Sequence, residues 1–338
     1  MALAFGHTTA DGQSFSVPAP LMAYSFKTSR GDGVVCNVRI DKISIVFTPE
    51  HPSPAQVVEK LQNMYAHLKQ TGQMTYKKAG IYKFGYGLTI AKNKSKVFIQ
   101  AAPKSAKSAG NFVRLEFNPD KLGPNGTRKV FETLAAQLGP DFSQAHLATH
   151  ARVTSIDLAV DLVNLHLSDL LIEKGDSHKT HVYYGKTGRQ ETFYGGIHAS
   201  KKSGSLKFYN KAQELLDTDG VLTGLHLPPE IPLSRLEVKC VTKLPLIRLD
   251  EIKNPFMQAD VYLVRDQGGP EGSRLWRWFI DSCRMRGIER VKNTMPPELL
   301  SGYEQSLAAG YNTVFRADAI WKKWPIALTA SGLLPTAN

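Results

Sequence analysis

Apolar and polar residues alternate in many short segments of the first two thirds of the chain, and this alternation predicts β-strands. Residues 34–48 (VVCNVRIDKISIVFT) are rich in β-branched side chains and indicate one or two strands. The same pattern recurs in GYGLTIA, KVFIQAAP, NFVRLEFN, RVTSIDLAVDLVN, HVYYGK, ETFYGG, SLKFYNK and LSRLEVKC. Residues 1–32 show no period and are rich in Ser, Thr, Pro and Gly, so we expect a flexible N-terminal segment there.

Helical periodicity marks other segments. Ser53 and Pro54 are typical of an N-cap and a first helical turn, and they precede an apolar face formed by Val57, Leu61, Tyr65 and Leu68. A second helix is predicted over residues 126–139, with inward positions Val130, Phe131, Leu134 and Leu138. Short helices are expected in SDLLIEKG and KAQELLD. From about residue 246 onward, helical patterns with tryptophans dominate.

The order of strands and helices repeats along the chain. The phrase Arg-Leu-Glu occurs at 114–116 and again at 235–237, each time within an apolar strand, although a phrase of three residues can also recur by chance. We therefore predict an α+β fold with a duplicated β-α-β-β-type antiparallel sheet. The predicted regions are the flexible segment 1–32, a sheet domain 33–245 with halves of about 33–145 and 146–245, and a helical C-terminal region 246–338.

Composition narrows the classes of partner and compartment. The 338 residues include 42 Lys and Arg against 30 Asp and Glu, and the net charge of +12 indicates a polyanionic partner, nucleic acid before anionic lipid. The cysteines Cys36, Cys240 and Cys283 form neither a CxxC pair nor a disulfide pattern, which favours a reducing cytosol. No signal peptide and no apolar stretch of roughly 18 residues is present, so we expect neither secretion nor a membrane partner.

Acidic residues lie within predicted strands. In SIDLAVDL a period of two places Asp157 and Asp161 on one strand face and Ile156 and Leu158 on the other. Buried carboxylates need a partner, and four oxygen donors would suit Mg²⁺ or Mn²⁺. Two alternatives stay open: an exposed acidic strand face, or ion pairs with Arg114 and Arg235. The four candidate metal ligands are Asp157, Asp161, Glu116 and Glu237.

A tyrosine in SLKFYNK is a candidate nucleophile. Alternation places Tyr209 on the same face as Lys207 and Lys211. A phenol with a pKa near 10 is a poor nucleophile at neutral pH, but a neighbouring cation lowers this pKa and offsets the charge of a phosphate under attack. The alternative is an ordinary sheet tyrosine, because the same region also contains Tyr183, Tyr184 and Tyr194.

Two basic regions are candidate DNA contacts. Eight lysines and no acids lie between Tyr76 and Lys107, interleaved with aromatic residues, which suits backbone contacts and base stacking. Between Gly272 and Lys292, six Lys and Arg face two acids. Either region could instead be a solvated surface. The predicted contacts are Lys92, Lys94, Lys96 and Lys207 for the DNA backbone and Arg284 and Arg286 for guanine edges.

Motifs in a fixed order resemble those of the rolling-circle replication initiators of plasmids and filamentous phages. This replication initiation factor family includes the phage gene II-type nicking proteins. The similar segments are VRLEFNPDKLG, RVTSIDLAVDL, ETFYGGIHASKKSGSLKFYNKAQE and LSRLEVK, within roughly residues 35–245. Residue by residue, the resemblance makes Tyr209 the nucleophile and Lys211 and Glu214 its flanking positions. It makes Asp157, Asp161 and Glu237 an acidic cluster attributed to metal binding.

The match has two departures. The His-hydrophobe-His pair of the broader nicking-enzyme class is replaced by His178 and His181, which are separated by two residues rather than one. The absence of the histidine pair fits the family's use of carboxylates in place of histidines. It leaves open which residues of this chain would bind the metal. In the C-terminal region we recognise no motif.

The resemblance implies a rolling-circle DNA replication initiator that is an endonuclease, a nickase. It would cut one strand of an origin, form a 5′-phosphotyrosyl link, free a 3′-OH and later rejoin the displaced strand, with Mg²⁺ or Mn²⁺ as cofactor. Its partners would be origin DNA, double-stranded and single-stranded, and a host helicase and DNA polymerase, in the cytoplasm of a bacterial host cell. A homodimer is left open. The chain has no GxxxxGK[ST] loop, so unwinding would fall to the helicase.

Two rival functions have different signatures. A non-catalytic, sequence-specific DNA-binding regulator on a decayed initiator fold predicts DNA binding without a covalent adduct. A tyrosine recombinase would need a His-x-x-Arg helix and arginines ahead of a tyrosine near the C-terminus, and the sequence lacks that arrangement.

Overall fold

The chain forms two compact units, each assembled from three separate segments. The first unit comprises Met1–Val38, Ala159–Lys239 and Asn254–Lys323, and the second comprises Arg39–Leu158, Cys240–Lys253 and Trp324–Asn338. The chain passes between them within strand β10 (Arg152–Val163). The computed structural model describes residues 4–335 except 79, 91–94, 106–110, 176–179, 187, 189, 197–203, 219–224, 226 and 266–272.

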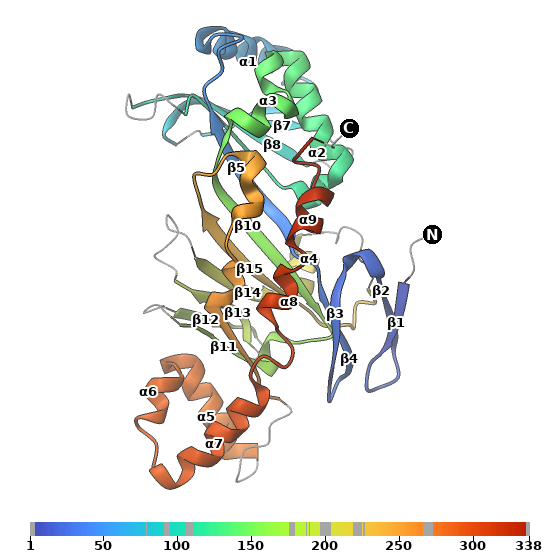
Figure 1. The fold of residues 1–338 in the computed structure, drawn as a ribbon, viewed down its shortest axis with the longest axis vertical. Coiled ribbons are helices and arrows are strands. Elements are labelled where there is room, and N and C mark those ends of the chain that lie inside the picture. Colours follow the sequence, from blue (N-terminus) through green and yellow to red (C-terminus); the bar gives the residue numbers. More distant parts are fainter. Residues whose placement is uncertain are drawn as a thin grey trace. The chain divides into compact units, whose positions relative to one another are not determined.

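An antiparallel sheet with helices forms the second unit (Figure 1). Its described pairings are antiparallel and give the strand order β5 (Arg39–Phe47), β9 (Val113–Phe117), β8 (Lys96–Pro103), β7 (Tyr82–Thr89) and β6 (Met74–Tyr76). The helices of this unit are α1 (Pro54–Leu68), α2 (Pro119–Leu138), α3 (Gln144–His150) and α9 (Trp324–Ala330). Helix α2 packs against β5.

The two long predicted helices are confirmed. Helix α1 begins with a capping box of Ser53 and Gln56 and with Pro54 in its first turn, and it buries Val57 and Leu61. Helix α2 starts earlier than predicted, because the side chain of Asn118 caps its first turn and the helix continues across a kink at Gly123, where φ is 68°. The predicted inward residues are buried: Val130, Phe131, Leu134 and Leu138.

The strands of the first unit also pair in antiparallel fashion. The strand order is β12 (Thr180–Tyr184), β13 (Gln190–Gly195), β14 (Ser205–Asn210), β15 (Leu233–Val241) and β10. Strand β4 (Gly31–Cys36) pairs with β10 and with β3 (Met22–Thr28). Two separate pairs join β1 (Ala4–Thr8) to β2 (Ser14–Pro18) and β11 (Leu170–Lys174) to β16 (Ala259–Leu263).

Three helices of the first unit pack around aromatic side chains. They are α5 (Ser273–Arg286), α6 (Ile288–Lys292) and α7 (Pro297–Gly310), and the unit also contains α4 (Lys211–Thr218) and α8 (Ala317–Trp321). The rings of Trp276 and Tyr303 stack at 5.7 Å between centroids, and Phe279 stacks on both. These residues share a core with Leu171 of β11. After residue 246 the described chain contains α5, α6, α7, α8 and α9 together with β16.

Two predictions differ from the structure. Residues 1–32 were expected to be a flexible segment, but they contain β1, β2 and β3. Phe15 and Val17 of β2 alternate with serines and are buried against Val34 and Cys36, which holds the segment to the core. SDLLIEKG was expected to be helical, but only a 3₁₀ turn forms at Leu167–Asp169, and β11 follows because its apolar run pairs with β16.

The predicted fold class is correct: the structure is α+β. Within the described residues, no helix has both the length and the low polarity that a membrane crossing requires.

Candidate active site

Strand register gathers the candidate residues of the first unit on one face of its sheet. Tyr209 lies opposite Thr192 and Arg235, while Lys207 lies opposite Tyr194 and Glu237. Because side chains alternate along a strand, both rows of residues point to the same side. We call this side the Tyr209 face, and across β12, β13, β14 and β15 it carries Tyr183, Thr192, Tyr209 and Arg235 in one row and His181, Tyr194, Lys207 and Glu237 in the other.

The phenol of Tyr209 is held by a carboxylate. Its Oη donates a hydrogen bond to Oε1 of Glu237 at 2.6 Å, and Nζ of Lys207 lies 3.6 Å from the centroid of its ring. Only 4% of Tyr209 is exposed. Burial, reinforced by the charge of Glu237, raises the pKa of Tyr209 well above its ordinary value. The phenol is therefore neutral, and Glu237 is the group positioned to accept its proton.

An ion pair follows Tyr209 at the start of α4. The side chain of Asn210 accepts a hydrogen bond from the backbone N–H of Gln213, which explains why the strand changes to a helix at this point. Lys211 is buried, donates to Glu214, and has its Nζ 5.7 Å from the ring centroid of Tyr209. Although burial raises the pKa of Glu214, the hydrogen bond and charge of Lys211 lower it overall. The ion pair of Lys211 and Glu214 therefore lies next to the ring of Tyr209, at the start of α4.

A second ion pair on this face is fully buried. Nε and Nη2 of Arg235 donate to the two carboxylate oxygens of Asp161 at 2.6 and 3.0 Å. The side chain of Arg235 is 3% exposed and that of Asp161 is 0% exposed. This bidentate pair holds the guanidinium beside Tyr209, because Arg235 faces Tyr209 in the register.

The two remaining acids lie in the second unit. Glu116 accepts hydrogen bonds from Arg114 at 2.5 Å and from Lys42 at 2.8 Å. Asp157 is partly buried, and its charge adds to the burial that raises the pKa of Cys240 to about 12. The ion pairs that were an open alternative to a metal are therefore formed by Glu116 and by Asp161.

A divalent cation does not fit the described residues by themselves. In the part of the chain that the structure describes, no three His, Cys, Asp or Glu side chains are grouped closely enough to hold a metal ion. The mechanism proposed below therefore contains no step through a metal.

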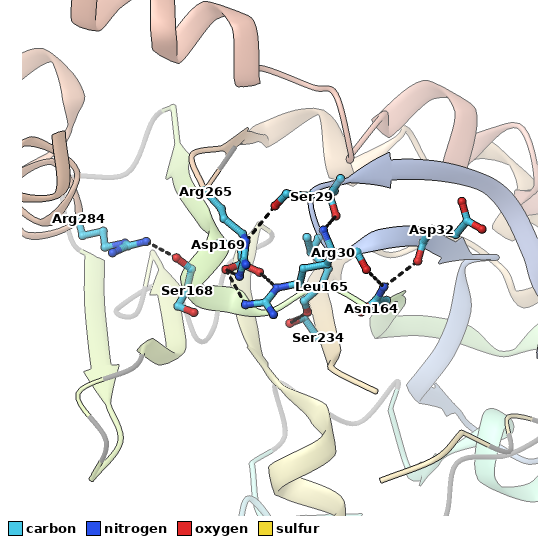
Figure 2. Close-up of polar contacts among 11 residues, drawn as sticks. Ser29, Arg30, Asp32, Asn164, Leu165, Ser168, Asp169, Ser234, Arg265 and Arg284 are labelled. Carbon is cyan, nitrogen blue, oxygen red and sulfur yellow. Dashed lines mark hydrogen bonds and ion pairs between the residues drawn. The ribbon is translucent and has the colours of Figure 1, made fainter. Parts of the chain in front are cut away.

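The predicted DNA contacts are distributed unevenly. Lys92 and Lys94 lie outside the described residues, as does His178, whereas Lys96 is exposed at the start of β8. Arg284 is 11% exposed, and its guanidinium donates to Asp281 and to the backbone oxygens of Ser168 and Leu170, as Figure 2 shows for Ser168. Arg286 is exposed in the last turn of α5. Of these two arginines, Arg286 is therefore the one with an exposed side chain.

Sequence reasoning missed one polar cluster in the first unit. Asp169 is buried and accepts hydrogen bonds from Arg30 at 2.7 Å and from Arg265 at 3.5 Å (Figure 2). Arg265 also donates to the side chain of Ser29. The cluster ties the β3–β4 turn to β11 and β16, and no local sequence pattern marks it, because its members are far apart in the chain.

Comparison with known proteins gives a distant relative. No protein-family model matches the chain. The sequence is similar to a replication initiation protein of Staphylococcus aureus, with 24% identity over 218 residues that cover 62% of this chain and 64% of the relative. The chain thus spans less than two thirds of the length of that curated relative.

Proposed function

We propose that the protein initiates DNA replication by the rolling-circle mechanism and that Tyr209 is its nicking residue. The distant relative named a replication initiation protein supports a role in replication initiation. The net charge of +12 supports DNA as the partner. The observation that carries the proposal is the 2.6 Å hydrogen bond from the phenol of Tyr209 to Glu237, on a sheet face that also holds Lys207 and Arg235.

The proposed reaction is a transesterification. Glu237 takes the proton of the Tyr209 hydroxyl while the phenolic oxygen forms a bond to the phosphorus of the scissile phosphodiester. The bond from phosphorus to the 3′-oxygen breaks, and that oxygen leaves with the electron pair and takes up a proton from water. The products are a 5′-phosphotyrosyl link and a free 3′-OH for a polymerase to extend. The reverse reaction rejoins the displaced strand.

The charges around Tyr209 suit a phosphate. The Lys207 ammonium covers the phenol ring and can offset the charge of the reacting phosphodiester, whereas the charge of Arg235 is already paired with Asp161. Because Tyr209 is only 4% exposed, Lys207 would leave the ring and bind the incoming phosphate when the substrate enters.

The duplicated nuclease-like architecture is part of this proposal. Each unit contains an antiparallel sheet with an Arg-Leu-Glu strand, β9 in the second unit and β15 in the first. In both strands the arginine is bound to a carboxylate, Arg114 to Glu116 and Arg235 to Asp161. We propose that only the first unit kept a nucleophilic tyrosine, Tyr209, next to its Arg-Leu-Glu strand.

A second candidate function has two observations in its favour. The low exposure of Tyr209 and its raised pKa would also suit a non-catalytic DNA-binding regulator that uses the same fold. Such a protein binds DNA but forms no covalent link to it.

One experiment separates these functions. The protein is incubated with labelled single-stranded DNA from the origin of its own replicon, with Mg²⁺ or Mn²⁺ added, and then run on a denaturing gel. The nicking proposal expects a protein–DNA band that survives denaturation and disappears after digestion with protease. A regulator gives a shift on a native gel and no such band.

Glu237→Gln is expected to slow adduct formation about 100-fold, because the amide still accepts the hydrogen bond but cannot take the proton. Single-turnover formation of the adduct measures the effect. The matched control is Glu116→Gln, the same change in the other Arg-Leu-Glu strand, where Arg114 and Lys42 already bind the carboxylate. An equal loss in both variants would argue against Glu237 as the proton acceptor.

The same assay tests the Mg²⁺ or Mn²⁺ requirement that was predicted from the sequence. If Asp157 or Glu237 supplies oxygen ligands in the DNA complex, adduct formation stops in excess EDTA and returns when either cation is added. An unchanged rate in EDTA would refute the requirement.

The two basic regions are expected to respond differently to mutation. Replacing Lys92, Lys94 and Lys96 together by Ala should weaken binding to all DNA and lower the salt dependence by about one unit of slope per lost phosphate contact. Arg286→Ala should instead relax the preference for origin DNA. Binding to origin and scrambled duplexes over a salt series measures both effects, and loss of preference in the lysine variant alone would reverse the assignment.

A further inference from the structure

Exposed aromatic side chains lie on the Tyr209 face at the edge of the sheet. Tyr183 of β12 is 56% exposed, and the partly buried Tyr194 of β13 meets it edge to face, with 5.8 Å between ring centroids. Strand β12 is the last strand in the order of this sheet, so its outer edge is not paired with another described strand. Tyr183 therefore presents an exposed ring at this edge, and the ring of Tyr194 lies against it. We call Tyr183 and Tyr194 the tyrosine platform.

The platform is in register with the candidate site. Tyr183 and Tyr209 lie in one row, separated by Thr192, and Tyr194 lies directly opposite Lys207 in the other row. Neighbouring strands are roughly 4.8 Å apart, so β12 and β14 are separated by about 10 Å. Exposure falls along the first row from 56% at Tyr183 to 4% at Tyr209. A strand of DNA bound at the platform could therefore extend along this row of residues to the hydroxyl of Tyr209.

We propose that the tyrosine platform binds single-stranded DNA by stacking on bases that flank the scissile phosphate, while Lys207 contacts the backbone between them. The identity of the ligand rests on the function proposed above. An aromatic ring can stack on any base whose face is free, and an adjacent cation suits the phosphate that follows each base. In a duplex the faces of the bases are already covered by their neighbours, so the platform selects the single-stranded form.

A neighbouring tyrosine provides a matched control. Tyr184 follows Tyr183 in β12 and is 43% exposed, but a register shift separates the two residues. The charges of Arg284 and Asp281 on α5 act on Tyr184, and α5 packs against β12. Tyr184 is therefore turned toward α5, whereas Tyr183 contacts Tyr194. An Ala substitution at Tyr184 removes a tyrosine of similar exposure without touching the platform.

The test is binding of the protein to a fluorescein-labelled oligothymidylate of about 20 nucleotides, longer than the ~4–16 nucleotides that one single-strand-binding module covers. Tyr183→Ala and Tyr194→Ala are each expected to weaken binding about 5- to 150-fold, the loss that corresponds to one base stacked on one ring. Tyr183→Phe and Tyr194→Phe keep the ring and should bind as the parent does. Tyr184→Ala should also bind normally.

Two further probes make the result specific. Binding to a duplex of the same length should not change in the Ala variants, and an abasic oligomer should bind equally to the parent and to the Ala variants. Unchanged oligothymidylate binding in both Ala variants would overturn the proposal, as would an equal loss in Tyr184→Ala or an equal loss on the duplex.

The outcome is independent of the nicking assay. A normal covalent adduct with no effect of the platform variants rejects the platform and leaves the proposed function intact. If the Ala variants bind oligothymidylate more weakly but no adduct forms under any condition, nicking is rejected. The Tyr209 face is then a binding site for single-stranded DNA without catalysis.

Discussion

Replacing Tyr209 by Phe is expected to abolish the covalent protein–DNA adduct and strand nicking. The substitution removes only the hydroxyl that donates to Glu237, and no other group on the ring can attack phosphorus. The ring is buried under Lys207 and still fills its place in the sheet, so DNA binding and the thermal unfolding temperature should stay close to those of the parent. The denaturing gel, a native gel and a thermal melt measure these three quantities.

Other tyrosines provide the controls for this prediction. Tyr194→Phe and Tyr184→Phe should both retain the adduct, because neither phenol has a described hydrogen bond to Glu237. An adduct that persists in Tyr209→Phe would place the nucleophile at another residue. A Tyr209→Phe protein that has lost DNA binding as well would indicate a structural role for the hydroxyl instead.

Replacing Arg235 by Met is expected to lower the free energy of unfolding by about 3–5 kcal/mol, the cost of removing one partner of a buried ion pair. The carboxylate of Asp161 is 0% exposed and loses two hydrogen bonds from the guanidinium. Replacing both partners, with Asp161→Leu and Arg235→Met together, should recover much of this loss, because no isolated charge then stays in the core. Urea denaturation of each variant measures the free energies.

The matched control is Arg248→Met. Arg248 forms an ion pair with Glu251, but their side chains are 57% and 43% exposed. Exposed pairs contribute little to stability because water screens their charges, so this variant should unfold almost as the parent does. Equal losses in Arg235→Met and Arg248→Met would contradict the role of burial. A double replacement less stable than Arg235→Met alone would do so too.

Local patterns predicted the elements around the site better than the contacts within it. The N-cap and apolar spacing of α1 and the alternation of SLKFYNK are properties of adjacent residues, and both appear in the structure. Alternation alone also places Lys207 and Tyr209 on one face. It could not show that Glu237, 28 positions later, accepts the phenol hydrogen bond, because that pairing depends on the register of β14 and β15.

The pairing of charges was equally beyond local patterns. Asp161 was a candidate metal ligand because its spacing from Asp157 suggested a shared acidic face. The structure instead gives it Arg235, which lies 74 positions away. Arg284 looked like an exposed helical cation, yet backbone oxygens of Ser168 and Leu170 occupy its guanidinium. In each case the partner comes from another part of the chain, and only the tertiary fold brings it close.

The interleaving of the two units has a consequence for synthesis of the protein on the ribosome. The first unit needs residues up to Lys323, and the second is completed only by Trp324–Asn338. Trp324 is 1% exposed and donates its indole hydrogen bond to the backbone of Leu249, so the last segment fills the core of the second unit. Neither unit can therefore finish folding before its last segment has left the ribosome. Nascent chains would expose unpaired strands until these segments have been synthesised, which makes the yield of native protein sensitive to chaperones and to premature termination.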